Sequence, residues 1–115
     1  MAYDVKLKAL QTFDTGAKRD TTKGKGRYDL ISPIMLRRLA DLYEAGGVQK
    51  GDRDWEKGFP MSRGMDSAQR HINQYREGLR DEDHLIQAIW NLACVVHFEE
   101  QIQRGLLSAD LDDLP

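Results

Sequence analysis

The stretch Met65–Gln103, MDSAQRHINQYREGLRDEDHLIQAIWNLACVVHFEEQIQ, decides how the rest of the chain can fold. Its pattern predicts two helices joined by an acidic corner at residues 79–83, LRDED. In the second helix an aliphatic stripe recurs at i, i+4, i+7 and i+11, the spacing of a helix face that packs against a core. The stripe that we therefore expect to be buried consists of Leu85, Ile89, Leu92 and Val96.

A second face of the same helix is polar. His84, Gln87 and Asn91 are spaced at i, i+3 and i+7, which places them on one side of the helix. His71, on the preceding helix, comes toward the same corner. A lone histidine on a helix is most often structural, but two histidines among acidic residues can bind a metal or accept a hydrogen bond. We call His84, Gln87 and Asn91 the polar file and expect it to line the functional site.

The composition is that of a small polar protein. The 115 residues suffice for one domain, and because 31% of them are charged we expect homo-oligomerisation to complete the core. The net charge of −2 argues against a DNA or RNA partner. The chain shows no signal peptide and no apolar run of about 18 residues, which predicts a cytoplasmic protein without a membrane partner. The single cysteine, Cys94, excludes an intramolecular disulfide and is predicted to be a buried thiol.

The N-terminal segment 1–31 is predicted to be an irregular arm. Residues 1–12 fit either a short strand or a helical turn. Residues 14–25, DTGAKRDTTKGK, are rich in glycine, threonine and charge, which predicts a flexible loop. The segment carries a basic cluster that is either a solvated loop or an arm that grips phosphate, since glycines let backbone N–H groups approach an anion. The cluster consists of Lys18, Arg19, Lys23, Lys25 and Arg27.

The first long helix is predicted to begin at Ser32-Pro33, an N-cap followed by proline, and to end at Gly46-Gly47. Near its C-terminus Asp41 and Glu44 are three residues apart and share one face. Carboxylates at that end oppose the helix dipole unless a cation offsets them. The pair is therefore either a magnesium site or a solvated acidic face.

The segment 49–60, QKGDRDWEKGFP, is predicted to be an irregular loop. It carries Trp55 among alternating charges. This side chain either anchors the loop to the core or offers a ring on which a base can stack, with Arg53 or Lys57 near a phosphate.

The predicted architecture is all-α, a small helical bundle with a long, loop-rich N-terminal segment. Within a single domain, 1–115, the helical core is expected at 32–105. Ser62 is expected to cap the second helix and Asp81 the last one, which runs to about Arg104. An acidic tail at 106–115 either frays or packs on a neighbouring molecule.

Four segments together resemble a known family. They are GKGRYDLISPIMLRRLADLY (24–43), GDRDWEKG (51–58), DSAQRH (66–71) and HLIQAIWNLA (84–93). They are similar to the phage dATP/dGTP diphosphohydrolase N-terminal-domain family, and more distantly to the all-α MazG-like nucleotide pyrophosphohydrolases. The resemblance implies a helical bundle, often oligomeric, that works in phage nucleotide metabolism in the host cytoplasm. It also implies magnesium-dependent hydrolysis of a nucleoside triphosphate to its monophosphate and pyrophosphate.

The resemblance also implies roles for the candidate site residues, as metal ligands, catalytic residues or nucleotide-binding residues. Asp41 and Glu44, helped by Asp83, would hold Mg²⁺ or Mn²⁺. His71 or His84 would be catalytic, orienting the attacking water or moving its proton. The nucleotide would be held by ten residues: Lys25, Arg27, Tyr28, Asp52, Arg53, Trp55, Lys57, Arg70, Gln87 and Asn91.

Two departures from the family pattern keep other functions open. Gln87 stands where a second histidine of a His-x-x-His pair is expected, and Gln49-Lys50 stands where the family has Lys-Tyr. Neutral side chains hold magnesium far less well than carboxylates do. One alternative is therefore a non-catalytic, sponge-like protein that sequesters a nucleotide signal of host defence. Another is a purely structural helical module.

Overall fold

The computed structural model describes residues 9–115, which fall into two compact units that meet in sequence between Ile31 and Ser32. The first unit contains an antiparallel hairpin of β1 (Leu10–Thr12) and β2 (Lys18–Asp20), followed by a 3₁₀ turn, Tyr28–Leu30. Gly16 closes the hairpin in the left-handed region, at φ +87°. The prediction of a flexible loop over 14–25 is therefore wrong at β2. The segment 1–12 was expected to be either a short strand or a helical turn. Its residues 1–8 lie outside the described part of the chain, and Leu10–Thr12 is the strand β1.

The second unit begins with helix α1 (Pro33–Lys50). The Ser32 side chain accepts a hydrogen bond from the Met35 N–H at 3.1 Å, so the predicted start is confirmed. The predicted end at Gly46-Gly47 is wrong, because α1 continues through both glycines to Lys50 and stops at Gly51, whose φ is +102°. Glycine weakens a helix interior without breaking it, so a glycine pair marks an end only where the chain also turns left-handed.

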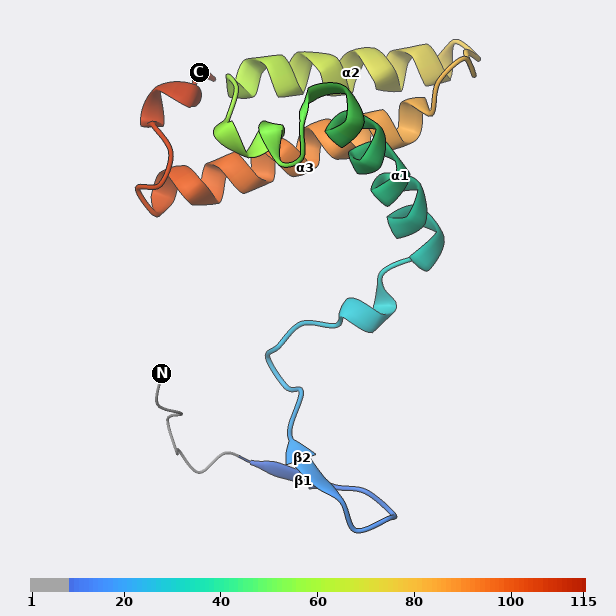
Figure 1. Ribbon diagram of the computed structural model, residues 1–115, viewed down its shortest axis with the longest axis vertical. Helices are drawn as coiled ribbons and strands as arrows, with labels where there is room; N and C mark the ends of the chain where they lie inside the picture. The colour runs from blue at the N-terminus through green and yellow to red at the C-terminus, as the bar shows by residue number, and fades with distance from the viewer. Residues whose placement is uncertain (1–8) are drawn as a thin grey trace. The chain divides into compact units, whose positions relative to one another are not determined.

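Helices α2 (Met61–Arg76) and α3 (His84–Gln103) form an antiparallel pair, and α1 crosses α3 (Figure 1). Asp83, not the expected Asp81, caps α3 by accepting a hydrogen bond from the Ile86 N–H at 3.3 Å. A short 3₁₀ helix, η2 (Asp54–Lys57), replaces part of the expected irregular loop. The three helices confirm a mostly helical protein, to which the hairpin adds a small sheet.

The hydrophobic core lies between α2, α3 and η2. Met61, Cys94 and Phe98 are buried at its centre, and Trp55 and Trp90 are among the side chains packed around them. The predicted burial of Cys94 is confirmed, and this burial raises the pKa of its thiol to about 12.

The tail packs on its own unit, in contrast to the expected fraying or packing on a neighbouring molecule. Leu107 joins the core, and the Asp113 carboxylate accepts hydrogen bonds from the N–H of Ser62 at 2.9 Å and from its hydroxyl at 2.5 Å. Ser62 was expected to cap α2 with its own side chain. Instead, Asp113 satisfies the first turn of that helix, which begins after Pro60.

The aliphatic stripe of α3 lies on the exposed side of the helix, so the prediction of its burial is wrong. Its four side chains are between 37% and 66% exposed, whereas His84 and Asn91 of the polar file are 1% and 5% exposed. Residues 84–98 contain no Asp, Glu, Lys or Arg, so hydrophobicity alone does not select the buried face. Close approach selects it: a Cβ on Gly64 of α2 would collide with Val95 and approach the Asn91 carbonyl.

None of the helices in the described residues combines the length and the apolar character needed to cross a membrane.

Candidate active-site pocket and histidine corner

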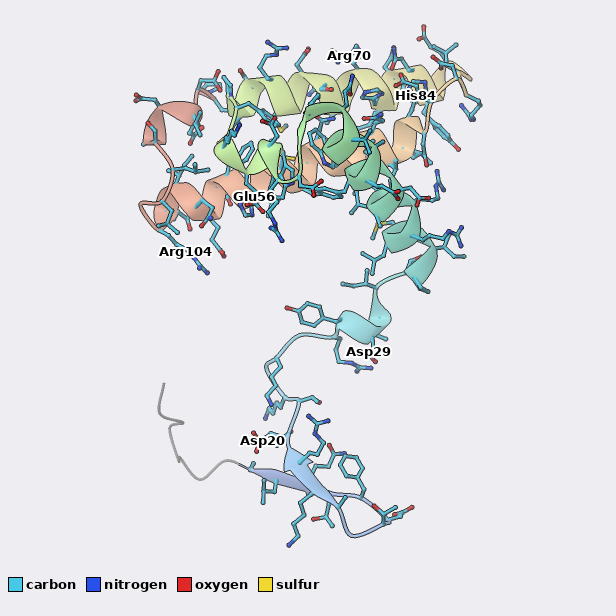
Figure 2. The ribbon with its side chains drawn as sticks, viewed as in Figure 1. Asp20, Asp29, Glu56, Arg70, His84 and Arg104 are labelled. Carbon is cyan, nitrogen blue, oxygen red and sulfur yellow. The ribbon has the colours of Figure 1, made fainter. Side chains whose placement is uncertain are left out.

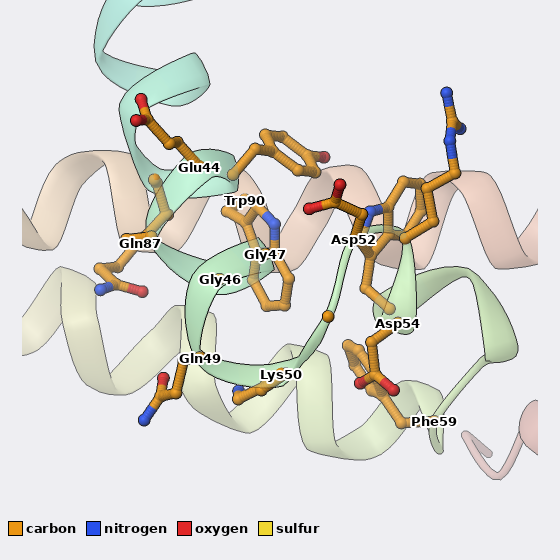
Figure 3. Close-up of a pocket in the computed structure, with 16 residues that line it drawn as sticks. Glu44, Gly46, Gly47, Gln49, Lys50, Asp52, Asp54, Phe59, Gln87 and Trp90 are labelled. Atoms are coloured by element: carbon orange, nitrogen blue, oxygen red, sulfur yellow. The ribbon is translucent and has the colours of Figure 1, made fainter.

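A pocket of about 710 Å³ lies between the C-terminal end of α1, the loop into η2, and α3 (Figure 3). Its size is within the roughly 300–1,000 Å³ usual for small-molecule sites. Three carboxylates line it, Glu44, Asp52 and Asp54, together with the cations of Lys50 and Arg53. The pocket therefore combines acidic and basic groups in one place.

Gly47 and a tight turn position the Asp52 carboxylate. The Gly51 N–H donates to the Gly47 carbonyl at 2.9 Å, which folds the chain back on the last turn of α1. The Asp52 carboxylate then occupies the space that a Cβ on residue 47 would fill. Arg53 follows in the left-handed region at φ +60°, the one non-glycine residue of the described chain with a positive φ. Such a conformation is costly for an arginine and is typical of a functional turn.

The pocket carboxylates differ in their partners. Asp54 pairs with Lys57 at 3.0 Å. Glu44 and Asp52 form no ion pair with any residue in the described part of the chain. These two carboxylates are therefore free to bind a cation.

Aromatic rings form the apolar wall of the pocket. The Tyr43 ring lies edge-on to Trp55 and Trp90, with centroid distances of 5.8 and 6.3 Å, and Phe59 stacks on Trp90 at 6.2 Å. Burial also raises the pKa of the Tyr43 hydroxyl. Trp55 is both packed against the core and part of the wall, so its two proposed roles, anchor and stacking surface, are compatible.

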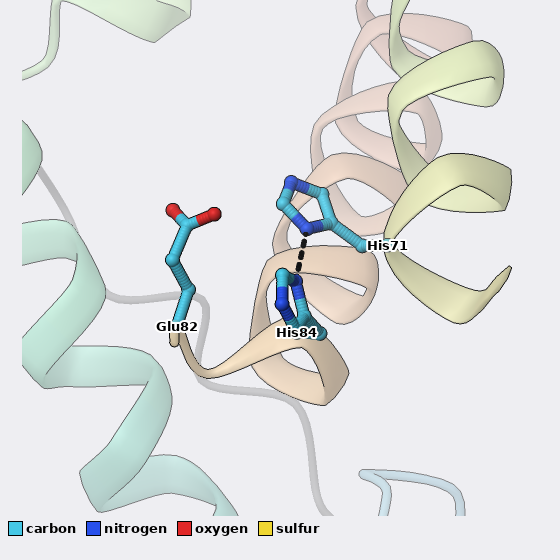
Figure 4. Close-up of side chains that lie close together, drawn as sticks. All are labelled: His71, Glu82 and His84. Atoms are coloured by element: carbon cyan, nitrogen blue, oxygen red, sulfur yellow. Dashed lines mark hydrogen bonds between the residues drawn. The ribbon is translucent and has the colours of Figure 1, made fainter. Parts of the chain in front are cut away.

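The two histidines meet near the C-terminal end of α2. Together with Glu82 they form a separate site, His71, Glu82 and His84, that we call the histidine corner (Figure 4). The two Nδ1 atoms lie 2.9 Å apart, and His84 Nε2 lies 2.8 Å from the Asp81 carboxylate. Both rings are buried, with 9% and 1% exposure. Burial lowers the pKa of His71, which favours its neutral form. The hydrogen bond with His84 lowers the pKa of Asp81.

The family model for dATP/dGTP diphosphohydrolase, N-terminal, matches residues 15–106 of the chain. The protein belongs to this family. The match includes both the pocket and the histidine corner, and it confirms the resemblance seen in the four sequence segments. No curated protein and no solved structure matches the chain. The family name points to a hydrolase that acts on purine deoxynucleoside triphosphates.

The structure of this diphosphohydrolase-family protein distributes the expected site residues over several places. Five of them line the pocket: Glu44, Asp52, Arg53, Trp55 and Gln87. His71 and His84 form the histidine corner instead. Lys25, Arg27 and Tyr28 belong to the first unit, where Arg27 pairs with Asp29 at 2.8 Å.

The remaining expected residues have other contacts. Asp41 is exposed and does not line the pocket. Asp83 caps α3 and binds Arg38 of α1 through two hydrogen bonds, and this contact lowers the pKa of the Asp83 carboxyl. Asn91 donates to the Gln87 carbonyl at 2.8 Å, in the buried interior. Arg70 pairs with Asp66 at 3.1 Å on the outward side of α2, away from His84 of the histidine corner (Figure 2).

Sequence reasoning missed several residues of the pocket and the corner. Tyr43, Trp90, Asp54 and Glu82 were given no individual role, and Gly47 was expected to end the helix. A usable signal was the sequence Gly-Asp-Arg-Asp at 51–54, because it places two carboxylates directly after the helix that carries Glu44. No comparable signal distinguishes Glu82 from the other acidic residues of the corner.

Proposed function

We propose that the protein hydrolyses a purine deoxynucleoside triphosphate to its monophosphate and pyrophosphate in the pocket between α1, η2 and α3. The observation that carries the proposal is the combination in this pocket of two cations, an aromatic wall and two carboxylates that form no ion pair within residues 9–115. A nucleotide needs these three kinds of partner: a metal site for its phosphates, positive charge beside them, and a ring against its base.

In this proposal Glu44 and Asp52 hold Mg²⁺ or Mn²⁺. Carboxylate oxygens suit these hard ions, and one or two carboxylates suffice because Mg²⁺ keeps several waters and also binds the substrate phosphates. Bound there, the metal supplies neutralisation of phosphate charge and a more reactive water. The pocket contains no cysteine or histidine, so its donors fit magnesium better than a softer metal.

The other pocket residues bind and orient the nucleotide. Lys50 and Arg53 neutralise the phosphates, for which Arg53 exchanges its ion pair with Glu56, at 2.6 Å, for a phosphate oxygen. Trp90 and Tyr43 offer ring surface to the purine. Gln87, on the α3 side, can hydrogen-bond the base or a water through its amide. We do not carry forward a catalytic role for His71 and His84, because neither lines the pocket.

The test is hydrolysis of a panel of nucleoside and deoxynucleoside triphosphates with Mg²⁺ or Mn²⁺, read by chromatography. Monophosphate should appear together with pyrophosphate. Glu44→Gln and Asp52→Asn should each lower kcat/KM by about 100-fold or more, because each removes a metal ligand. The matched control is Asp41→Asn, one turn earlier on α1 and outside the pocket, which should retain activity. Full activity of both pocket variants would refute the assignment, and loss of activity in the control would move the metal site to Asp41.

A second candidate function is nucleotide binding without hydrolysis. It is favoured by Gln87, which lines the pocket where a histidine is expected in the family. In this case calorimetry would show tight binding without added Mg²⁺, and the nucleotide would be recovered intact.

We also propose that the protein is a homo-oligomer that pairs through the exposed stripe of α3. The stripe presents four large aliphatic side chains, and an exposed apolar row of this length is unusual for a monomer. A two-fold axis would place the stripe against its own copy, so that apolar residues meet apolar residues.

A further inference from the structure

We propose that the histidine corner is a binding site for a borderline transition-metal ion, with Zn²⁺ as the best match. His71, Glu82 and His84 would be its three protein ligands. The site shares no residue with the pocket of the proposed hydrolysis.

The three ligand atoms are already close enough to share one ion. One nitrogen of each histidine and a carboxylate oxygen of Glu82 all lie within 4.8 Å of one another. Zinc binds histidine nitrogen at roughly 2.0–2.1 Å and carboxylate oxygen at roughly 2.0–2.2 Å, so tetrahedral ligands lie about 3.4 Å apart. The Nδ1 atoms, at 2.9 Å, need to separate by only a few tenths of an ångström.

The surrounding hydrogen bonds prepare the histidines as ligands. Asp81 accepts from the Nε2–H of His84, which leaves the Nδ1 lone pair of that ring directed at His71. A carboxylate that holds the far nitrogen of a metal-binding histidine is the usual second partner in zinc sites.

The charges around the pair also favour a cation. A simple hydrogen bond between the two imidazoles would explain the 2.9 Å contact, but it would give Glu82 no partner. The Glu82 carboxylate makes no hydrogen bond or ion pair with the described residues, yet it lies beside both rings (Figure 4). Asp81 adds a second negative charge near His71, opposite the positive charge of Arg70. A divalent ion would balance the two carboxylates.

The chemistry of the ligand set selects the metal. Two imidazole nitrogens and one carboxylate suit zinc, cobalt or nickel, whereas magnesium takes oxygen ligands. Three protein ligands leave a fourth position for water or another ligand. Because His71 lies on α2, His84 begins α3 and Glu82 lies in the turn just before it, a bound ion would also join the two helices at their corner.

The experiment uses the full chain without a polyhistidine tag, stripped of metal with a chelator and titrated with Co²⁺. With millimolar Mg²⁺ present to occupy the pocket carboxylates, the expected result is a visible absorption band that saturates at one Co²⁺ per chain and disappears on addition of Zn²⁺. Zn²⁺ should also raise Tm. His71→Ala should abolish the band. Glu82→Gln, at an exposed position that does not contribute to the core, should weaken binding by at least about tenfold.

One control variant distinguishes the corner from general acidity. Glu77→Gln removes an exposed glutamate outside the cluster and should bind Co²⁺ like the parent protein. The proposal is overturned if stoichiometric Co²⁺ gives no band, or if Glu82→Gln binds Co²⁺ as tightly as the parent. The second criterion applies even if His71→Ala fails to fold.

Discussion

Gly47 shows how a single residue shapes the proposed active site. The Asp52 carboxylate occupies the position of a Cβ on residue 47, so Gly47→Ala must displace a proposed metal ligand. We expect this variant to lose at least about tenfold in kcat/KM while remaining folded, since alanine stabilises a helix interior by roughly 0.5–1 kcal/mol relative to glycine.

Gly46→Ala is the matched control for this prediction. Residue 46 lies in the same helix, and a Cβ there would meet nothing within 4 Å. This variant should gain thermal stability and keep its activity. Parallel measurements of kcat/KM and Tm on both variants decide the issue, and equal activities would show that the position of Asp52 is unimportant.

Individual residues also show which local rules can be applied to the sequence. Ser32 could be identified as a cap because its partner, the Met35 N–H, is three residues away. The choice between Asp81 and Asp83 could not be made in this way. Asp83 is the cap because Arg38 holds it from another helix, while Asp81 is bound to His84. Such a choice depends on contacts between residues that are distant in sequence.

At the scale of elements, α3 is the helix whose environment was hardest to predict. Because residues 84–98 lack charge, its periodicity identified an aliphatic stripe but not the face that α2 covers. The small residues of α2 decide this, since Gly64 and Ala68 let the polar file of α3 come close. The histidine corner follows from the same packing, and for that reason its two rings could be paired from sequence while Glu82 could not.

The proposed pairing through the exposed stripe of α3 can be tested with a single charged substitution. Ile89→Lys places a charge in the middle of the stripe, so it should convert the proposed oligomer to a monomer without unfolding the protein. Light scattering coupled to size-exclusion chromatography measures the mass directly. Asn73→Lys, at an exposed position on α2, is the matched control and should leave the mass unchanged. A parent protein that is monomeric at tens of micromolar would contradict the pairing.

At the scale of the whole molecule, the two units divide the chain unequally. Every residue of the hydrophobic core and of the proposed active-site pocket belongs to the unit Ser32–Pro115. The helical character of this unit was predictable from caps and periodicity. The hairpin of the first unit was not, because its strands are three residues long and fully exposed, so they carry no alternating apolar pattern.

This division predicts that the second unit is self-sufficient. A chain that starts at Ser32 should keep its helical circular-dichroism signal and a Tm within a few degrees of the parent, because none of the core residues described lies before Ser32. It should also keep nucleotide hydrolysis, since the pocket is intact. Loss of the cooperative unfolding transition would show that the first unit stabilises the fold, and loss of hydrolysis alone would show that it takes part in the reaction.

The contact between Ser62 and Asp113 has a consequence for the order of events during synthesis. The two residues are 51 positions apart, yet Asp113 accepts the hydrogen bonds of Ser62 in the first turn of α2. While the ribosome adds α3 and the segment after it, the opening turn of α2 lacks this acceptor and can fray. That turn carries Met61, a central core residue, so this part of the core gains its capping acceptor only after residue 113 has been added.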